Sequence, residues 1–440
     1  MSETVTQTRL SNGLLVSLKE IHTSPLISHW VWYRVGSRNE RPGTTGISHW
    51  VEHMLFKGTP AYPSQLIDRV ISREGGIWNA FTYLDWTTFF ETMPAETIEL
   101  AMQLEADRMV NSLFDQEEVT AERTVIISER QGNENEPLFR LGEQMQAMSF
   151  MVHSYHHEII GDLADLETIQ RDDLYGHYRR YYVPGNAILA IAGDFETGAM
   201  LDQVHRIYES IPAGQPPAAA TRPEPAQRGE RRVTVEGPGE TIYIQAAYHV
   251  PVATHPDFFP LTVLDSLFSG PSSLNVFGGN LSNKTSRLYR ALVEKELAVS
   301  VDGSLPATVD PYMYTFTAIV HPQKSAEDVL RAIDEEIETA QSSAPTASEL
   351  TRAVKQARAL FAYGSESVSN QAFWLGFAEM FASYDWFTTY LDQLAAVTPE
   401  DVLRVAQTYL RPQNRILGVY LPTHDGAPLD SAGPDDMLDG

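Results

Sequence analysis

The chain of 440 residues repeats part of its own sequence, and this repetition constrains its fold more than any other feature. The pattern Asn-x-Ile-Leu at positions 186–189 recurs at positions 414–417, and a Tyr and a Pro precede both copies at the same spacing. Segments 49–58 and 261–270 form a second match, with a shared frame of apolar positions that ends in Phe-x-Gly. Two matches in the same order predict a duplicated domain, one copy of which carries polar residues that the other lacks.

A proline-rich segment separates the two copies. Residues 212–229 contain five prolines, which exclude a regular helix or a central strand and favour an extended chain. We therefore expect a first domain over residues 1–211, a linker over 212–229 and a homologous domain over 230–422. The remaining residues, 423–440, contain five Asp and are expected to form a frayed acidic tail.

The predicted elements of the first copy favour an α+β fold. Alternating apolar residues flank Ser-Asn-Gly at 11–13, which predicts a hairpin, and residues 28–35 have the aromatic and β-branched composition of a strand. Residues 78–94 predict two strands around a turn, whereas residues 45–56 and 115–133 show helical spacing. Because strands and helices are mixed rather than strictly alternating, we predict two duplicated α+β domains, each with a mainly antiparallel sheet and helices packed on one face.

The charge composition excludes some classes of partner. The chain has 58 Asp and Glu against 32 Lys and Arg, a formal net charge of −26, which argues against binding nucleic acid or an anionic membrane. No stretch approaches 18 uninterrupted apolar residues, and no signal-peptide pattern is visible at the N-terminus. With no cysteine there is no disulfide or thiolate metal site. We therefore expect a cytoplasmic protein that binds neither nucleic acid nor membranes.

Residues 46–58 contain the pattern that carries chemistry. His49 and His53 are four residues apart on a predicted helix, so their imidazoles share one face and can bind one metal ion. Glu52 lies on the same face, where it can reach a metal-bound water, and H-x-x-E-H is one of the zinc-peptidase motifs. A surface helix with two exposed histidines is the plainer alternative. The flanking apolar residues place the helix at the edge of a core, however, so its polar stripe needs a partner such as a metal.

A catalytic zinc site also needs a third protein ligand and one open position. Glu122 and Glu129 are seven residues apart and share a helical face, with the apolar Val125 and Ile126 expected on the inward side between them. The spacing alone leaves the choice between these two acids open. Other candidates are Glu117, Glu118, Glu134 and Glu136, and the histidines His153, His156 and His157 are a competing source of ligands.

Taken together, these features resemble the pitrilysin/insulysin family of zinc peptidases, which includes the mitochondrial processing peptidase and bacterial processing-peptidase-like proteins. The motif at 46–58 matches, as do a Glu at the family's spacing after the second His and an acid seven residues before that Glu. Residues 76–82 resemble the family's Asn-Ala-x-Thr edge strand, residues 187–195 its strand ending in Gly-Asp, and residues 278–288 its Gly-Gly…Ser-Arg-Leu segment. The resemblance runs along the whole chain and implies two similar α+β domains joined by a linker.

The resemblance also implies roles for individual residues. It makes Glu129 the third ligand, with His49 and His53, of one Zn²⁺ per chain. Glu122 takes the role of a second acid that supports the ligands and catalysis. Glu52 is implied as the base that accepts a proton from zinc-activated water during hydrolysis of a peptide bond.

The implied substrates are peptides or unfolded segments. Asn79, Ala80 and Phe81 would present an edge strand that pairs with an extended peptide, although ordinary sheet pairing is the alternative for this strand. Because the net charge of −26 makes an enclosed chamber attract cations, we expect basic or neutral peptides to be preferred.

The sequence departs from the family pattern in its second half. Self-sufficient single-chain members carry an Arg there, followed seven residues later by a Tyr. In residues 291–300, Val293 stands where the Arg is expected and no Tyr follows. The resemblance therefore implies the zinc-bearing subunit of a heterodimer with a homologous, Arg/Tyr-bearing chain, and weak or absent activity in isolation. A homodimer through the same surfaces is the other possibility.

Three functions compete on this evidence. The first is a zinc metalloendopeptidase, and the second is a non-catalytic structural subunit of a complex that retains the zinc site. The third is a metal-binding protein without hydrolytic activity, in which Glu52 would have no purpose. The presence of all the motif residues favours the first, since structural relatives of this family typically lose them.

Overall fold

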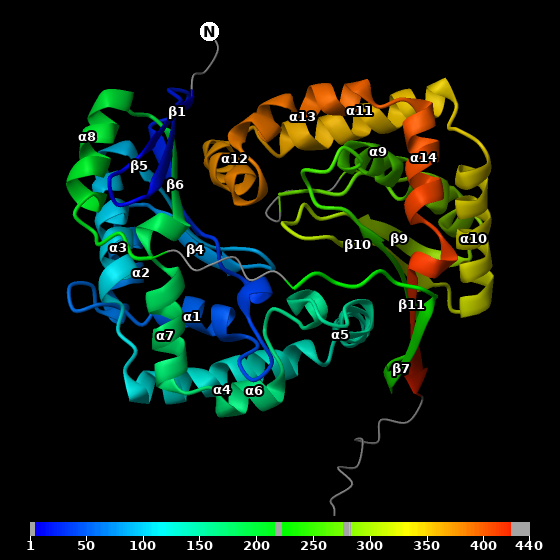
Figure 1. Ribbon diagram of the computed structural model, residues 1–440, viewed down its shortest axis with the longest axis horizontal. Helices are drawn as coiled ribbons and strands as arrows, with labels where there is room; N and C mark the ends of the chain where they lie inside the picture. The colour runs from blue at the N-terminus through cyan, green and yellow to red at the C-terminus, as the bar shows by residue number, and fades with distance from the viewer. Residues whose placement is uncertain (1–4, 216–221, 276–280, 282, 424–440) are drawn as a thin grey trace, which may run out of the picture.

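The computed structural model describes residues 5–215, 222–275, 281 and 283–423, which form two sheets with helices around them (Figure 1). The first sheet runs β1 (Val5–Arg9), β2 (Leu15–Glu20), β6 (Ala187–Gly193), β3 (Leu26–Tyr33), β5 (Thr87–Pro94) and β4 (Ile77–Thr82). The second runs β7 (Arg231–Pro238), β11 (Arg415–Thr423), β8 (Tyr243–Val250), β10 (Tyr312–Val320) and β9 (Ala298–Ser304). The pairs β2–β6 and β7–β11 are parallel, and the other pairs of the described sheets are antiparallel. Apart from the additional β1, the two orders coincide, which confirms the predicted fold of two duplicated α+β domains.

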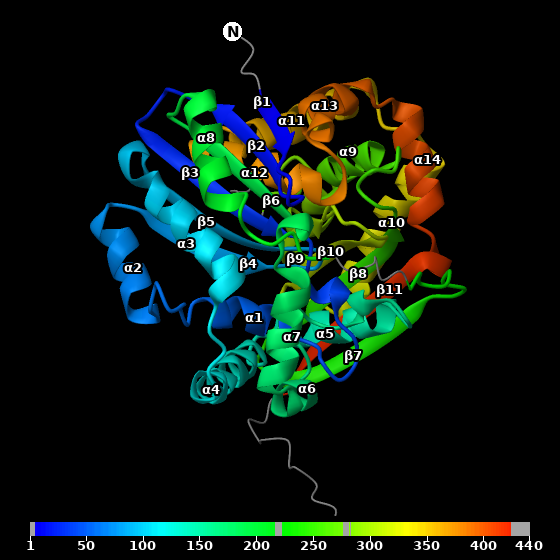
Figure 2. The same ribbon diagram turned by 60° about the vertical axis from the view of Figure 1, so that its left-hand side comes forward.

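The helices of the two copies follow a similar succession, although the described part of the first copy contains two more α-helices than that of the second. The first copy contains α1 (Ile47–Leu55), α2 (Ser64–Arg73), α3 (Ile98–Asn111), α4 (Gln116–Asn133), α5 (Pro137–Ser149), α6 (Leu163–Thr168), α7 (Arg171–Tyr181) and α8 (Thr197–Tyr208). The second contains α9 (Phe258–Phe268), α10 (Ala326–Ser342), α11 (Ala347–Tyr363), α12 (Val368–Phe381), α13 (Tyr384–Ala396) and α14 (Pro399–Tyr409). In the turned view of Figure 2, α3 and α8 lie over one face of the first sheet, where they contact β2, β3 and β5.

One helix of each copy packs on the sheet of the other copy. Helix α12 of the second domain lies against β3 and β6 of the first sheet, and α5 of the first domain lies against β7 and β11 of the second (Figure 1). Phe373 of α12 meets Trp30 edge to face, with ring centroids 5.7 Å apart, inside one continuous core. Leu141 and Met145 of α5 pack with Ile416 of β11 in a separate core cluster. The exchange gives the two domains shared cores.

The repeated Asn of the sequence forms the same hydrogen bond in both copies. The Asn186 side chain donates to the carbonyl oxygen of Tyr181 at 2.9 Å, and that of Asn414 donates to the carbonyl oxygen of Tyr409 at 2.8 Å. Each bond fixes the turn between a helix, α7 or α14, and the strand that follows it, β6 or β11. The recurrence of Asn-x-Ile-Leu therefore reflects a repeated helix–turn–strand unit.

Some predicted segments lie outside the described residues. These are most of the acidic tail, residues 216–221 of the linker and part of the 278–288 segment. Within the part of the chain that the structure describes, none of the helices combines the length and the apolar character that crossing a membrane requires.

Candidate metal centre

Helix α1 turns the two histidines of the H-x-x-E-H motif away from its buried face, whereas Glu52 is itself buried. It begins after Gly46, and its residues Trp50, Val51, Met54 and Leu55 are fully buried in the first domain's core. The pattern of apolar positions therefore fixes the rotation of the helix. His49 and His53 fall on a common face, with ring centroids 4.6 Å apart.

The two imidazoles point at one carboxylate of α4. Nε2 of His49 lies 3.9 Å from Oε1 of Glu129, and Nε2 of His53 lies 3.7 Å from Oε2 of the same side chain. The ligand atoms of these three residues lie within 4.8 Å of one another. Two imidazole nitrogens and one carboxylate oxygen form a donor set that catalytic zinc sites use, with Zn–N and Zn–O bonds of about 2.0–2.2 Å. The residues present therefore fit a zinc ion.

The competing histidines are engaged elsewhere. Nε2 of His153 lies 3.0 Å from Oδ2 of Asp310 in the second domain, and Nδ1 of His157 lies 3.0 Å from the carbonyl oxygen of Glu158. Among the described residues, only His49, His53 and Glu129 form a group of three or more side chains able to hold a metal.

Glu122 and Glu129, which the spacing could not distinguish, occupy different environments. The Glu122 side chain is 7% exposed and contacts Nδ1 of His53 at 2.8 Å, behind the ring, whereas the Glu129 side chain is 42% exposed and faces both Nε2 atoms. Ile126 is buried as expected, but Val125 is 50% exposed, so the expectation that it faces inward is wrong. The α4 face that carries both acids is turned partly to solvent, and Val125 lies on it.

Lys57 completes the contacts of Glu122 and was not foreseen from the sequence. Its ammonium group forms an ion pair with Oε2 of Glu122, while Oε1 meets His53. Partial burial would raise the pKa of Glu122, but the hydrogen bonds with His53 and Lys57 outweigh it and lower that pKa. Burial likewise opposes the charged form of His53, yet the Glu122 hydrogen bond leaves the His53 pKa raised. Glu122 thus acts as a charged partner that orients one imidazole.

Burial is the largest influence on the pKa values of His49 and Glu52. Burial, with a smaller contribution from His53, lowers the pKa of His49 to about 3, and its buried Nδ1 has no hydrogen-bond partner among the residues that the structure describes. Burial raises the pKa of Glu52 to about 7, against the opposing hydrogen bond from Thr82. His49 is therefore a neutral imidazole, the form that coordinates a metal.

Thr82 connects Glu52 to the edge of the first sheet. Its hydroxyl donates to Oε2 of Glu52 at 2.6 Å, and it is the last residue of β4. The signal for this contact was present in the Asn-Ala-x-Thr segment, but the distance of 30 residues in sequence concealed the pairing. The strand that precedes the site therefore holds one oxygen of Glu52.

Among the described strands, β4 forms the edge of the first sheet beside this site. It pairs with β5 on one side and is the last strand in the order of the sheet. Asn79 and Phe81 are exposed and Ala80 is buried, as the pleat requires, and Oδ1 of Asn79 accepts a hydrogen bond from the N–H of Ala80 at 2.8 Å. Binding of a substrate by these residues stays a prediction.

Comparison with known proteins agrees with this geometry. A family model described as "Insulinase (Peptidase family M16)" matches residues 15–162, and one described as "Peptidase M16 inactive domain" matches residues 168–357. Zinc protease PqqE of Helicobacter pylori is 28% identical, with 91% of this chain and 89% of that protein covered. Mitochondrial-processing peptidase subunit beta of Lentinula edodes is 25% identical, with coverages of 93% and 88%.

Solved structures extend the likeness to the whole fold. The crystal structure of a protease from Helicobacter pylori superposes with a TM-score of 0.89 at 26% identity, covering 96% of this chain and all of that one. Both family models describe M16 peptidase domains, and together they match residues of both sheets of the described structure. The chain therefore belongs to the M16, insulinase/pitrilysin-like, family of peptidases.

Proposed function

We propose that this chain is a zinc-dependent endopeptidase that hydrolyses peptides or unfolded segments. The convergence of His49, His53 and Glu129 on one point, with Glu52 on the same helix, is the observation that supports it. These residues would hold one Zn²⁺ and leave one coordination position for water. Relatives named zinc proteases that cover most of this chain favour the same activity.

When bound, zinc supplies Lewis acidity and lowers the pKa of coordinated water towards roughly 7. The protein's own residues do the rest. Glu52 takes up the proton released as the peptide carbonyl is attacked and returns it to the leaving amine. Thr82 holds Oε2 of Glu52, so Oε1 is the oxygen left to carry that proton. Glu122 keeps the His53 ring turned so that Nε2 faces Glu129.

The free edge of β4 supports an extended substrate. A peptide added as a further strand beside residues 79–81 would form main-chain hydrogen bonds that tolerate varied side chains. Because Thr82 follows directly on this edge, the strand that would align the substrate also holds Glu52. With 58 acidic against 32 basic residues in the chain, the proposed preference is for basic or neutral peptides.

The proposal includes a homologous partner chain. Val293 ends a short π-helical turn, Tyr289–Val293, and cannot donate the hydrogen bonds that an Arg would offer to a substrate backbone or a developing oxyanion. One relative carries the name of a subunit, mitochondrial-processing peptidase subunit beta. We propose that this chain is the catalytic member of a heterodimer in which the partner supplies the missing Arg and Tyr.

The test is a cleavage assay of purified, zinc-loaded chain on unstructured fluorogenic peptides, alone and with homologous chains of similar length. We expect weak or no cleavage alone and strong cleavage with the partner, abolished by the matched variant Glu52→Gln. Full turnover by the chain alone would show that the partner is unnecessary. A zinc-loaded chain that cleaves nothing with any homologous partner would favour the structural-subunit alternative.

A further inference from the structure

Helix α4 carries two Glu-Arg pairs seven residues apart, at 122–123 and 129–130, and only the glutamates contact the candidate metal centre. The arginines reach a different part of the chain. Nη2 of Arg123 donates to the carbonyl oxygen of Ile169 at 2.6 Å, and Nη1 of Arg130 donates to that of Gly161 at 2.7 Å. Each acid thus has a neighbouring cation that anchors α4 to residues 157–169, which we call the brace segment.

The brace segment also touches the start of α1. Gly46 and Gly161 lie backbone to backbone, with positive φ values of 83° and 86°. A Cβ on Gly46 would lie 2.3 Å from the carbonyl oxygen of Ile160, and one on Gly161 would lie 2.4 Å from that of Thr45. Only glycine at both positions allows this approach, because any side chain would push the two backbones apart.

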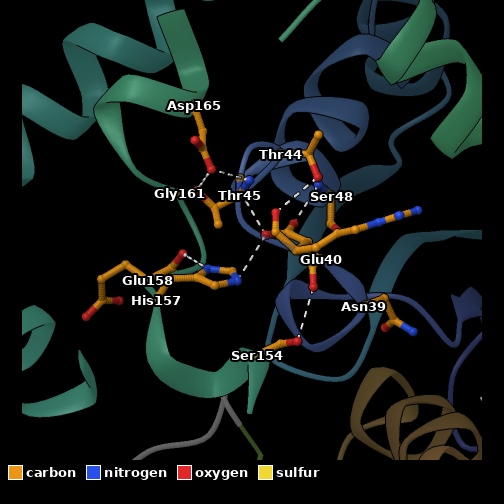
Figure 3. A network of polar contacts seen from close by, with 12 residues as sticks. Asn39, Glu40, Thr44, Thr45, Ser48, Ser154, His157, Glu158, Gly161 and Asp165 are labelled. Carbon is orange, nitrogen blue, oxygen red and sulfur yellow. Dashed lines mark hydrogen bonds and ion pairs between the residues drawn. The ribbon is translucent and has the colours of Figure 1, made fainter. Parts of the chain in front are cut away.

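Carboxylates fix the loop that leads into α1, as Figure 3 shows. Oδ2 of Asp165, in the brace segment, accepts hydrogen bonds from the N–H of Gly43 at 3.0 Å, the N–H of Thr45 at 2.9 Å and the Thr45 hydroxyl at 2.7 Å. In return, the hydroxyl oxygen of Thr45 accepts the N–H of Asp162 at 2.9 Å. The entry of α1 is thereby bonded to the same segment that holds Arg130.

Glu40 closes the N-terminus of α1 from the other side. Its buried carboxylate accepts the N–H of Gly46 and the N–H of Ser48, each at 2.8 Å, although α1 has no acidic residue in its own first turn. His157 of the brace segment has Nε2 3.7 Å from Oε2 of Glu40 (Figure 3). The free N–H groups of a helix start need such acceptors, so this carboxylate substitutes for the missing cap.

We infer that Arg130 is a positioning residue: through Gly161 it ties the helix that carries Glu129 to the start of the helix that carries His49 and His53. The brace segment holds the two helices at the separation that the three ligand atoms require before any metal binds. The inference rests on the proposed metal site.

The physical reason lies in how little else fixes Glu129. Its side chain is 42% exposed and stands 3.7–3.9 Å from the two imidazoles, beyond direct hydrogen bonding. The Arg130 guanidinium, in contrast, is buried and forms ion pairs with Glu134 and Glu143 in addition to its bond to Gly161. Ligand positions must be held within about 0.5 Å for a productive site, and buried supporting residues provide that precision.

The test measures the Zn²⁺ dissociation constant of the full chain by competition with a chromophoric chelator, together with the visible spectrum of the Co²⁺ form. We expect Arg130→Gln to bind Zn²⁺ about 10–100-fold more weakly and to alter the Co²⁺ spectrum. Asp165→Asn should weaken binding in the same direction, although Asp165 contacts neither the ligands nor Arg130. The double variant should bind Zn²⁺ about as weakly as whichever single variant binds it less tightly, because both substitutions break the same connection between α4 and α1 through the brace segment.

Arg171→Gln is the matched control. Nε of Arg171 also donates to a backbone carbonyl, that of Phe114 at 3.0 Å, in the same domain but outside the brace. It should bind Zn²⁺ as the unmodified chain does. Unchanged affinity in Arg130→Gln and Asp165→Asn would overturn the inference, as would weakening in Arg130→Gln alone or an equal weakening in Arg171→Gln. An unmodified chain that binds no Zn²⁺ would instead overturn the proposed metal site.

Discussion

Helices α1 and α9 occupy equivalent places in the two copies of the domain, yet only α1 presents a polar stripe to an open site. When segments 49–58 and 261–270 are aligned, His49, Glu52 and His53 correspond to Leu261, Leu264 and Asp265. The two leucines are fully buried in the second domain's core, and the Asp265 carboxylate accepts hydrogen bonds from the Ser269 hydroxyl at 2.9 Å and the Ser272 N–H at 2.7 Å. The same scaffold therefore supports either a solvent-accessible ligand set or a filled core.

The neighbouring helices differ in the same way. Helix α11 packs directly along α9 through the buried Ala353 and Ala357, and the Ser266 hydroxyl donates to the carbonyl oxygen of Ala353 at 2.8 Å. Its counterpart α4 faces α1 across His49, His53 and the two acids. A metal centre needs space between helices, and that space removes apolar contacts that would otherwise hold them together. In the first domain, hydrogen bonds to the brace segment take over this task.

The strongest test of the comparison removes a ligand. His49→Ala should reduce bound zinc from about one ion per chain to nearly none, because two protein ligands are too few for a stable catalytic site. The free energy of unfolding of its metal-free form should lie within about 1 kcal/mol of that of the metal-free unmodified chain. The reason is that Nδ1 of His49 makes no hydrogen bond to described residues that would be lost. Elemental analysis and urea unfolding check the two statements. Full zinc retention would remove His49 from the site.

Glu52→Gln distinguishes the contribution of α1 to zinc binding from its contribution to turnover. The substitution keeps the shape of the side chain and the ligands, so zinc content should not change. Turnover by the active assembly should fall about 10²–10⁴-fold, because the amide cannot accept the proton. Elemental analysis and initial rates on one peptide, measured side by side, provide the check. Normal turnover would mean that Glu52 is not the base.

The equivalent substitution in the second domain lies in α9. Leu261→Ala, at the position of His49, should leave zinc content unchanged and lower the free energy of unfolding by about 2–5 kcal/mol, because it opens a cavity in a packed core. Urea unfolding of the metal-free chain measures the loss. Loss of zinc with an unchanged free energy of unfolding would contradict the conclusion that α1 carries the metal ligands and α9 fills the core.

Local periodicity was enough to predict α1 and the face shared by its two histidines. The choice between Glu122 and Glu129 was not a local matter, because both acids lie on one helical face. It depended on which imidazole nitrogens each acid faces, and in the structure Glu122 contacts Nδ1 of His53 whereas Glu129 faces the Nε2 atoms of both histidines. Tertiary geometry of this kind leaves no trace in residue spacing.

The exchange of α5 and α12 between domains was also beyond the sequence. A pattern of apolar residues shows that a helix is buried, but it does not show which sheet covers it. In sequence, α5 and α12 each lie between strands of their own domain, although each packs on the sheet of the other. The duplication of the domain, in contrast, was predictable, because the repeated Asn, Pro and Tyr mark a helix–turn–strand unit that forms from neighbouring residues.

The smallest expected effect concerns Asp265, the counterpart of His53. Burial raises the pKa of Asp265 from its ordinary 3.8 to about 6, against hydrogen bonds from Ser272 and Ser269 that favour the charged form. Because the pKa is higher in the folded chain than in the unfolded one, the folded state binds this proton more tightly. Its contribution to stability is fully present below about pH 3.8 and is lost as the pH rises through about 6. The difference between these two pKa values corresponds to at most about 3 kcal/mol of unfolding free energy.

Asp265→Asn keeps the size of the side chain and removes the titration, so it isolates this contribution. The unfolding free energy of the metal-free chain, minus that of Asp265→Asn, should fall between about pH 4 and 6 and stay level above that range. Urea unfolding at several pH values in one buffer system gives the difference directly. A difference that is constant with pH would show that the α9 carboxyl titrates alike in the folded and unfolded chain. The Asp265 carboxyl would then be solvated as well in the folded chain as in the unfolded one, and the contrast between the two helices would rest on the leucines alone.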